Sequence, residues 1–408
     1  MKCRHCGTYL HNTFIDLGSA PPSNSSLTEQ SMQEPEKWYP LKVLVCDRCW
    51  LVQTEDFVGA GEMFSDEYAY FSSFSSSWLE HARNYVNQIT SRLSLDNKHT
   101  VVEVAANDGY LLQYVKERGI PCYGIEPTHS TAQVAREKGI EIIESFFGVD
   151  QAKDLVENGR QADLAIANNV LAHVPDINDF LRGFSILLKQ GGVATFEFPH
   201  LLNLVEQAQF DTIYHEHYSY LSLTAIRTIF EENGLVMFDV EELQTHGGSL
   251  RVFAQRLDTG KFPIEKNVID LQLREDTAGI STIEYYQGFQ AKAEKIKIGF
   301  LSFLVDAKQH GKRVAAYGAA AKGNTMMNFS GIRPDLLAYV VDRNPAKQDK
   351  YMPGSRIPIV NEKRLQIDKP DFVVILPWNL EDEVKRQLNY IRAWDGQFVI
   401  AVPEMKVI

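Results

Sequence analysis

The sequence predicts an α/β protein of three parts, and three observations predict this arrangement. Two Cys-x-x-Cys pairs lie within the first 49 residues, which is typical of a small metal-binding domain. A β-branched strand, a short turn and a helical pattern follow one another near residue 100, and a similar series begins near residue 313. Each series indicates a βαβ unit with a parallel sheet. We place the domains at residues 1–65, 66–240 and 241–408.

Composition excludes several classes of partner. The 408 residues are 44% hydrophobic and 23% charged, with a formal net charge of −12, so the chain is globular and acidic. Phosphate contacts need clustered Lys and Arg, and we therefore expect neither nucleic acid nor an anionic membrane as a partner. The N-terminus has no apolar signal-peptide region, and no apolar run reaches the roughly 20 residues of a membrane span. We expect a cytoplasmic protein, and a monomer.

The N-terminal cysteines predict a structural zinc site. Cys3 and Cys6 form one knuckle, Cys46 and Cys49 form a second, and four thiolates suit tetrahedral zinc. Such a set leaves no open position for catalysis, so we expect one structural zinc per chain. The alternative is two unrelated cysteine pairs in a reduced chain. The flanking segments are not basic, which argues against a nucleic-acid-binding ribbon.

The stretch HTVVEVAANDG predicts a cofactor site at a strand-to-helix turn. Its strand ends in an acid, its turn contains small and polar residues, and the next strand, CYGIEP, ends in Glu126. Glu126 is placed to bind a ribose diol, and Glu103 could meet the amino group of a methionine moiety. Without GxGxxG, this pattern suits S-adenosylmethionine better than a pyrophosphate, although an unliganded turn stays possible. We predict Ala105, Asn107, Asp108 and Gly109 as further cofactor-binding residues.

A third strand leads into a polar loop of the same domain. Asn168 and Asn169 end this strand, and the loop has the placement of one that lines the methyl donor. A helix, a Gly-Gly turn and another strand follow. This order of elements predicts a doubly wound methyltransferase core of the Rossmann-like type.

The stretch FDTIYHEHYSYLS, residues 210–222, predicts a catalytic site. His217 could act as general base, Glu216 as a partner that tunes it, and Tyr214 as a donor to an oxyanion. If the stretch is extended, Tyr214 and Glu216 share one face with Tyr218, while His215 and His217 share the other. One alternative is a metal site that uses His215 and His217, with a third ligand from His200, His246 or Glu197. Another is a polar structural network.

The C-terminal part predicts an anion site. KRVAAYGAAAKGNTMMNF indicates a strand, a Gly/Ala-rich turn and the start of a helix, which could receive a diphosphate. The alanines could instead mean close helix–strand packing. A long amphipathic helix is expected over residues 276–311, near the last domain boundary. The predicted substrate-binding residues are His246, Ser249, Arg251, Tyr317, Gly318, Lys322, Asn324 and Asp342, with Gly323 beside them.

The ordered motifs resemble a known family, the S-adenosylmethionine-dependent C-methyltransferases that act on nucleotide-linked keto-deoxysugars. The resemblance covers nearly the whole chain. It includes CRHCG, CDRCW, EYAYFSSFSSSW, EVAANDGYLLQ, ANNVLAHVPDINDF, FDTIYHEHYSYLS, THGGSLRVF, AAYGAAAKGNTMMN and VVDRNPAK. Two departures are the APPSN loop and Asp349, which stands where the family pattern leads us to expect a small residue.

The resemblance implies a zinc-bearing domain, a methyl-donor domain and a Rossmann-like domain that helps to hold the nucleotide sugar. It implies His217 as general base, Tyr214 and Glu216 as its neighbours, and His173 and Tyr68 as further active-site residues. The expected reaction methylates C3 of a 4-keto-deoxyhexose linked to a nucleotide, by default thymidine diphosphate (TDP). The alternatives are a zinc-ribbon methyltransferase acting on RNA or protein, and a non-enzymatic nucleotide-sugar binder.

Overall fold

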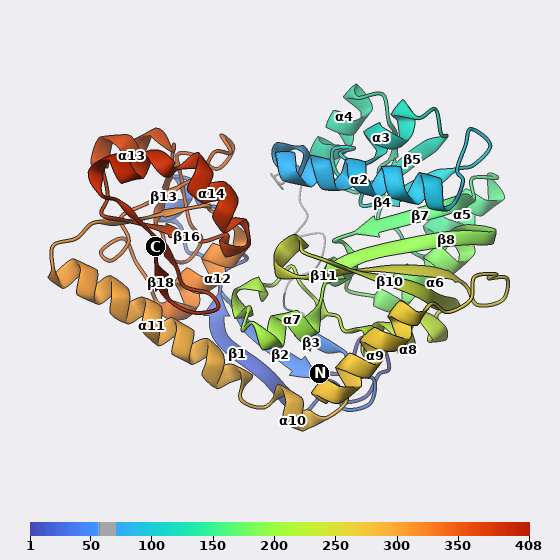
Figure 1. The fold of residues 1–408 in the computed structure, drawn as a ribbon, viewed down its shortest axis with the longest axis horizontal. Helices are drawn as coiled ribbons and strands as arrows, with labels where there is room; N and C mark the ends of the chain where they lie inside the picture. The colour runs from blue at the N-terminus through green and yellow to red at the C-terminus, as the bar shows by residue number, and fades with distance from the viewer. Residues whose placement is uncertain (56, 58–70) are drawn as a thin grey trace.

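Three β-sheets organise the described residues of the chain in this computed structural model (Figure 1). The structure describes residues 1–55, 57 and 71–408. The predicted active-site residue Tyr68 lies outside these described residues. The C-terminal part lies on one side of the molecule and the central part on the other, and strands β1 and β2 lie beneath and between them.

The N-terminal sheet takes its fourth strand from a distant part of the chain. Its order is β1-β2-β3-β9, and each neighbouring pair is antiparallel. The strands are β1 (Asn12–Ala20), β2 (Tyr39–Val45), β3 (Val52–Thr54) and β9 (Ser219–Tyr220). Strand β9 belongs to the histidine-rich stretch, so the N-terminal sheet and the predicted catalytic loop are parts of one structure.

The central sheet is doubly wound, as predicted. Its order is β10-β11-β8-β7-β4-β5-β6, and only β11 runs antiparallel to its neighbours. The strand order reverses between β4 and β7, and ligands bind at such switch points, beyond the carboxyl ends of the strands. The strands are β4 (Val101–Val104), β5 (Cys122–Ile125), β6 (Glu141–Ile143), β7 (Ala162–Asn168), β8 (Leu188–Pro199), β10 (Leu235–Leu243) and β11 (Ser249–Arg256).

Helices cover both faces of this sheet. One face packs against α2 (Ser76–Arg92), α3 (Leu112–Glu117) and α4 (His129–Glu137). The other packs against α5 (Val149–Glu157), α6 (Ile177–Leu187), α8 (Leu223–Glu232) and α9 (Lys266–Ala278). The short helix α7 (Leu201–Glu206) follows β8. The predicted boundary at residues 240 and 241 falls inside β10.

The C-terminal sheet repeats the doubly wound plan. Its order is β14-β15-β13-β12-β16-β17-β18, with antiparallel strands only at its two edges. The strands are β12 (Val314–Tyr317), β13 (Val340–Val341), β14 (Lys350–Tyr351), β15 (Pro358–Val360), β16 (Phe372–Ile375), β17 (Gln397–Ile400) and β18 (Lys406–Val407). The helices are α12 (Ala321–Ser330), α13 (Lys363–Asp368) and α14 (Glu381–Gln387).

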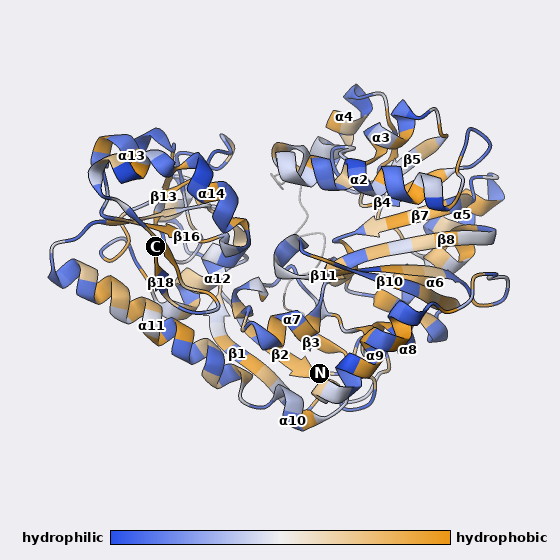
Figure 2. Cartoon of the chain, viewed as in Figure 1, coloured by the Kyte–Doolittle hydropathy of each residue, from blue (hydrophilic) through white to orange (hydrophobic). Residues whose placement is uncertain are grey.

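The N-terminal sheet contributes to the hydrophobic cores of both larger domains. Ile15 and Val43 pack in one core with α11 (Phe289–Gln309), α12 and one face of the C-terminal sheet. Leu44 and the cysteines pack in another core with the central sheet. Figure 2 shows hydrophobic colouring along β1 and the central strands, whereas the outer helices α13 and α14 are largely hydrophilic. The small domain therefore joins the two larger ones.

The prediction of a single long helix over residues 276–311 is wrong. Three helices are present instead: α9, which ends at Ala278, then α10 (Ile283–Tyr286) and α11 (Phe289–Gln309). Gly279 and Gly288 break the run, because both adopt the left-handed conformation, with φ of 86° and 84°. None of the helices in the described ranges is both long and apolar enough to cross a bilayer.

Candidate active site

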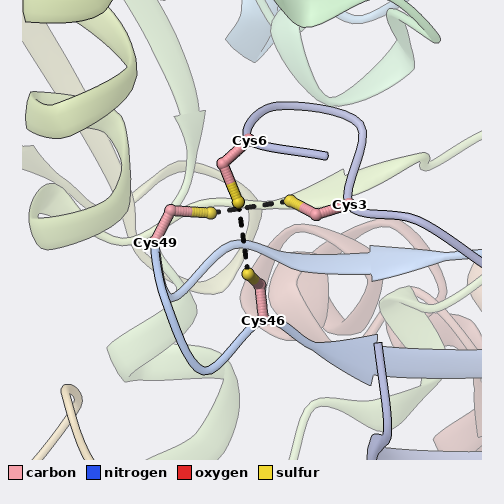
Figure 3. A group of neighbouring side chains, drawn as sticks. All are labelled: Cys3, Cys6, Cys46 and Cys49. Atoms are coloured by element: carbon pink, nitrogen blue, oxygen red, sulfur yellow. Dashed lines mark hydrogen bonds between the residues drawn. The ribbon is translucent and has the colours of Figure 1, made fainter. Parts of the chain in front are cut away.

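The four predicted metal ligands lie together at the end of the N-terminal sheet (Figure 3). Cys3 Sγ is 3.5 Å from Cys49 Sγ, Cys6 Sγ is 3.6 Å from Cys46 Sγ, and all four sulfurs lie within 4.8 Å of one another. All are free thiols. Tetrahedral zinc with bonds of about 2.3 Å holds its sulfurs about 3.8 Å apart. The four cysteines therefore fit a zinc ion.

The alternative metal site built on His215 and His217 does not form. His215 Nε2 faces the carbonyl oxygens of Tyr39 and Pro40 at 3.3 and 3.2 Å. His217 Nδ1 instead bonds to the carbonyl oxygen of Thr212 at 2.8 Å. Within the described ranges, the four cysteines are the only group of three or more His, Cys, Asp or Glu side chains that could hold an ion.

The predicted cofactor turn after β4 has the backbone of a ligand-binding loop. Ala105, Asn107 and Gly109 all have positive φ, at 60°, 49° and 74°. The Glu126 carboxylate accepts hydrogen bonds from the backbone N–H groups of Asn107 and Thr128, at 2.9 and 3.0 Å. Glu126 thus holds the turn in place from the end of β5, and burial raises its pKa.

Glu103 is a buried carboxylate that is suited to a cationic ligand. It lies in β4 with 1% of its surface exposed. The Tyr110 hydroxyl lies beside it, but neither carboxylate oxygen has a hydrogen bond of good geometry among the described residues. Burial raises the pKa of Glu103 well above its ordinary value, and the Tyr110 hydroxyl offsets only part of this rise. An unpaired buried carboxylate is costly, so a bound ammonium group would stabilise its charged form.

The polar loop after β7 continues the same edge. Asn168 is buried at the end of β7, and Asn169 follows in the left-handed conformation, with φ of 52°. The Asn168 Oδ1 and both side-chain polar atoms of Asn169 lack partners among the described residues. Asp108, by contrast, lies 3.6 Å from Lys138 Nζ. The carboxyl edge of the central sheet therefore offers several polar groups to a ligand.

The histidine-rich stretch is not extended, so the division of its side chains between two strand faces does not apply. A 3-10 turn covers Phe210–Thr212, and the His217 N–H donates to the Tyr214 carbonyl at 2.9 Å. Only Ser219 and Tyr220 form a strand. This turn brings Tyr214 and His217 together instead of placing them on opposite faces, and Tyr214 Oη lies 2.8 Å from His217 Nε2.

The hydrogen bonds of His217 define its tautomer. Because a carbonyl oxygen can only accept, the bond to Thr212 assigns the hydrogen to Nδ1. Nε2 is then the basic atom, and it accepts the Tyr214 hydroxyl. Burial lowers the pKa of His217 well below its ordinary value, and the nearby His173 adds to this effect. His217 is therefore neutral near pH 7, with its lone pair toward Tyr214.

His173 lies beside His217, whereas the Glu216 carboxylate bonds to another part of the chain. The His173 ring lies 4.7 Å from the His217 ring, centre to centre, and burial lowers the pKa of His173 to about 4. Glu216 accepts hydrogen bonds from the Asn24 N–H and Nδ2, at 3.3 and 3.1 Å. The partner of His217 Nδ1 is thus the Thr212 carbonyl, whereas Glu216 faces the APPSN loop.

The predicted anion turn of the C-terminal domain mirrors the cofactor turn. Gly318 has a φ of 92°, and an added Cβ there would lie 2.6 Å from Pro377. The Asp342 carboxylate accepts hydrogen bonds from the backbone N–H groups of Ala319 and Asn344, both at 2.8 Å. Tyr317 donates its hydroxyl to Gln387 at 2.9 Å. Asp342 thus anchors this turn as Glu126 anchors the other.

Lys322 is the cation at this turn. Its Nζ lies 3.0 Å from Asn379 Oδ1 and 4.4 Å from the centre of the Trp378 ring. Desolvation lowers the pKa of Lys322 to about 8. On the same helix, Asn324 is fully buried, and both of its side-chain polar atoms lack partners among the described residues. Both side chains of α12 therefore retain capacity for a polar ligand.

The other predicted substrate residues, His246, Ser249 and Arg251, lie at the central sheet. Arg251 is 2% exposed, in β11, and it forms ion pairs with Glu197 at 3.0 Å and Glu241 at 3.2 Å. Ser249 Oγ donates to the Thr245 carbonyl at 3.0 Å. Burial lowers the pKa of His246 to about 4, and Lys322 Nζ lies 3.5 Å from its carbonyl oxygen. Only His246 of these three contacts the C-terminal turn.

Sequence reasoning missed several residues at this junction. Asp211 is buried and accepts the Trp378 Nε1–H at 2.7 Å, although 167 positions separate the two. Burial raises the pKa of Asp211 to about 6. His81 bonds to the Glu197 carboxylate at 2.9 Å. The only signal for these contacts in the sequence is the polar residue Asp211 beside the histidines.

Comparisons with known proteins match three successive parts of the chain. Family models match residues 3–64 ("Putative zinc binding domain"), 78–240 ("Methyltransferase domain") and 244–403 ("C-methyltransferase C-terminal domain"). C-methyltransferase NovU of Streptomyces niveus is 32% identical over 410 residues, covering 100% of this chain and 96% of NovU.

More distant similarities are confined to part of the chain. A ubiquinone biosynthesis O-methyltransferase of Nitrosomonas europaea is 30% identical over 118 residues, 28% of this chain and 48% of that protein. The solved structure of magnesium protoporphyrin IX methyltransferase from Synechocystis covers 44% of this chain and 83% of its own, with 17% identity and a TM-score of 0.35. The likeness to NovU extends over all three sheets, and the chain therefore belongs to the C-methyltransferase family.

Proposed function

We propose that the protein transfers a methyl group from S-adenosylmethionine to C3 of a nucleotide-linked 4-keto-deoxyhexose. The observation that carries the proposal is His217, a neutral histidine whose basic nitrogen meets a tyrosine hydroxyl. Its loop also contacts both larger domains. The Tyr218 N–H bonds to Ala172 beside the central sheet, and Thr325 of α12 bonds to the Ile213 carbonyl.

The central edge supports binding of the methyl donor. S-adenosylmethionine supplies an electrophilic methyl group and carries a positive charge, an ammonium group and a ribose. The unpaired Glu103 would bind the ammonium group, and Glu126 would bind the ribose hydroxyls beside the turn. Asn168 and Asn169 provide further donors and acceptors at this edge.

The C-terminal edge supports binding of the second substrate. Lys322, Asn324 and the turn at Gly318 would hold the diphosphate of a nucleotide sugar, with TDP as the default nucleotide. Because the histidine loop contacts both the segment after β7 and helix α12, the sugar would lie near His217. Holding the two substrates in line replaces a bimolecular encounter with an intramolecular step.

The proposed reaction begins with proton removal from C3. The 4-keto group acidifies this hydrogen, and His217 Nε2 takes the proton while the electron pair forms an enolate. The Tyr214 hydroxyl, released from Nε2, donates a hydrogen bond to the enolate oxygen. C3 then forms the bond to the methyl group as the methyl–sulfur bond breaks. A positioned base is worth about 10²–10⁴-fold in rate.

Zinc has a structural role in this proposal. Four cysteine ligands complete a tetrahedral site and leave no position for a water or a substrate. The ion would stabilise the small N-terminal sheet, whose few strands enclose little core of their own.

The deciding experiment incubates the protein with S-adenosylmethionine and nucleotide-linked 4-keto-6-deoxysugars in heavy water. Mass spectrometry follows methyl gain and deuterium uptake. We expect a C3-methylated product with at least one sugar, and deuterium exchange at C3 without S-adenosylmethionine. A matched His217→Asn sample should show neither. Methylation of RNA or protein in place of any sugar would overturn the proposal and favour a macromolecular substrate. Binding of the sugars without exchange or methylation would favour a non-enzymatic role.

A further inference from the structure

The first cysteine knuckle contacts both loops that carry the central histidines. Arg4 lies between Cys3 and Cys6, and its guanidinium donates to the Thr54 carbonyl at 2.9 Å and to the Pro175 carbonyl at 2.8 Å. It also lies over the Tyr218 ring, 5.1 Å from the ring centre. Tyr218 follows His217 directly, and Pro175 lies two residues after His173.

A second path joins the metal ligands to the same loop. Gln53 is fully buried in β3, where its Nε2 donates to Cys3 Sγ at 3.2 Å and its Oε1 accepts the Arg4 N–H at 2.9 Å. Such contacts orient metal ligands and fix their surroundings. The backbone of Gln53 pairs with Ser219 in β9.

Thr54, the next residue of β3, holds the histidine loop from both its backbone and its side chain. Its N–H donates to the Tyr218 carbonyl at 3.1 Å, and its hydroxyl donates to the His217 carbonyl at 3.0 Å. Because Arg4 bonds to the Thr54 carbonyl, the knuckle, β3 and the catalytic loop form one continuous hydrogen-bonded unit.

We infer that the first cysteine knuckle sets the geometry of the two histidine loops, and that Arg4 is the positioning residue that links them. The inference rests on the proposed function for its kinetic consequence. The guanidinium of Arg4 bonds to the backbone carbonyls of Thr54 and Pro175, so it acts on the two loops through their backbones. The planar guanidinium is suited to this task, because it can bond two carbonyls in fixed directions at once.

The test compares Arg4→Met with Arg48→Met in the full-length, zinc-loaded protein. Arg48 is an exposed arginine of the second knuckle, so this control removes the same charge from the same metal site. Bound zinc per chain is measured first, and we expect it to be unchanged in both variants. In Arg4→Met, kcat should fall by about 10- to 100-fold, as expected for a misplaced reacting group. The KM values for both substrates should change little.

A second readout does not depend on activity. Nitrogen-15-labelled histidine gives ring signals that His173→Asn and His217→Asn variants assign by their loss. We expect both ring signals to shift in Arg4→Met and to stay in place in Arg48→Met. Removal of zinc by a chelator should shift the same two signals.

The outcomes separate this inference from the proposed function. Shifted ring signals with no methylation of any sugar by the unaltered protein would overturn the proposed function and support the positioning role. Unshifted signals and an unchanged kcat in Arg4→Met would overturn the positioning role alone. Loss of zinc in Arg4→Met, with activity restored by added zinc, would also overturn it, because Arg4 would then act only on metal binding.

Discussion

In both the central and the C-terminal domain, a carboxylate holds the turn after the first strand. The charged side chains beside the two turns differ in sign. In each, a carboxylate at the end of the neighbouring strand accepts two backbone N–H groups and holds the turn. Glu126 does so in the central domain and Asp342 in the C-terminal domain. The central turn adds the buried acid Glu103, whereas the C-terminal turn adds Lys322 and Lys347.

Under the proposed function, this difference in charge would let one fold serve two ligands. An acidic edge favours a cationic ligand such as S-adenosylmethionine, and a basic edge favours a diphosphate. In this proposal the carboxylate fixes the position of the turn, and the added charges decide which ligand the turn binds. The histidine loop lies between the two edges and belongs to neither sheet.

The largest expected effect comes from replacing His217, which should lower the rate of methyl transfer without changing ligand binding at either sheet edge. His217→Asn should lower turnover by about 10²–10⁴-fold, because it removes the proposed base. Affinities for S-adenosylmethionine and for the nucleotide sugar, measured by calorimetry, should stay the same, since neither turn is altered. A normal rate of methyl transfer in this variant would contradict the assignment of His217 as the base.

The next effect tests the acidic edge. Glu103→Gln should weaken S-adenosylmethionine binding by about 1.5–3 kcal/mol, because it removes a charged hydrogen-bond acceptor from a buried site. Titration calorimetry measures this loss, and nucleotide-sugar affinity is the internal control. An equal loss for both ligands would mean that the variant disturbs the fold and that the two edges are not independent.

The smallest expected effect is a change in nucleotide-sugar affinity with pH, which tests the role of Lys322 at the basic edge. Desolvation lowers the pKa of Lys322 to about 8, so its charge is present below this pH and is lost above it. Nucleotide-sugar affinity should therefore fall above about pH 8. Lys322→Arg should remove this fall, because arginine keeps its charge. A fall that persists in Lys322→Arg, or that also appears for S-adenosylmethionine, contradicts the assignment of Lys322.

Local sequence patterns predicted the parts of the molecule that neighbouring residues determine. The two cysteine knuckles and the turn at Ala105–Gly109 are short segments whose residue types specify their conformation. Both doubly wound sheets followed from the order of strands and helices. The histidine loop was singled out as a candidate site because so many polar side chains together are unusual, and its catalytic role stays a prediction.

Contacts between distant residues were not predictable in this way. The loop at Tyr214–His217 is a turn because β9 pairs with β3 and because its backbone bonds to Thr54. Arg4 meets Pro175 across 171 positions, and Trp378 meets Asp211 across 167. Such contacts depend on how whole domains pack, which periodicity does not encode. The helix break at Gly279 was missed for a different reason, since a glycine ends some helices and is tolerated in others.

The late origin of β9 has a consequence for synthesis on the ribosome. Strands β1, β2 and β3 emerge first, but their sheet gains its last strand only after β4 to β8 have been made. Until then the edge of β3 stays unpaired, and an unpaired edge invites pairing with other chains. A fragment that ends near residue 65 would keep this exposed edge permanently. The nascent protein should therefore depend on early capture of zinc, which its four cysteines can bind long before the histidine loop is translated.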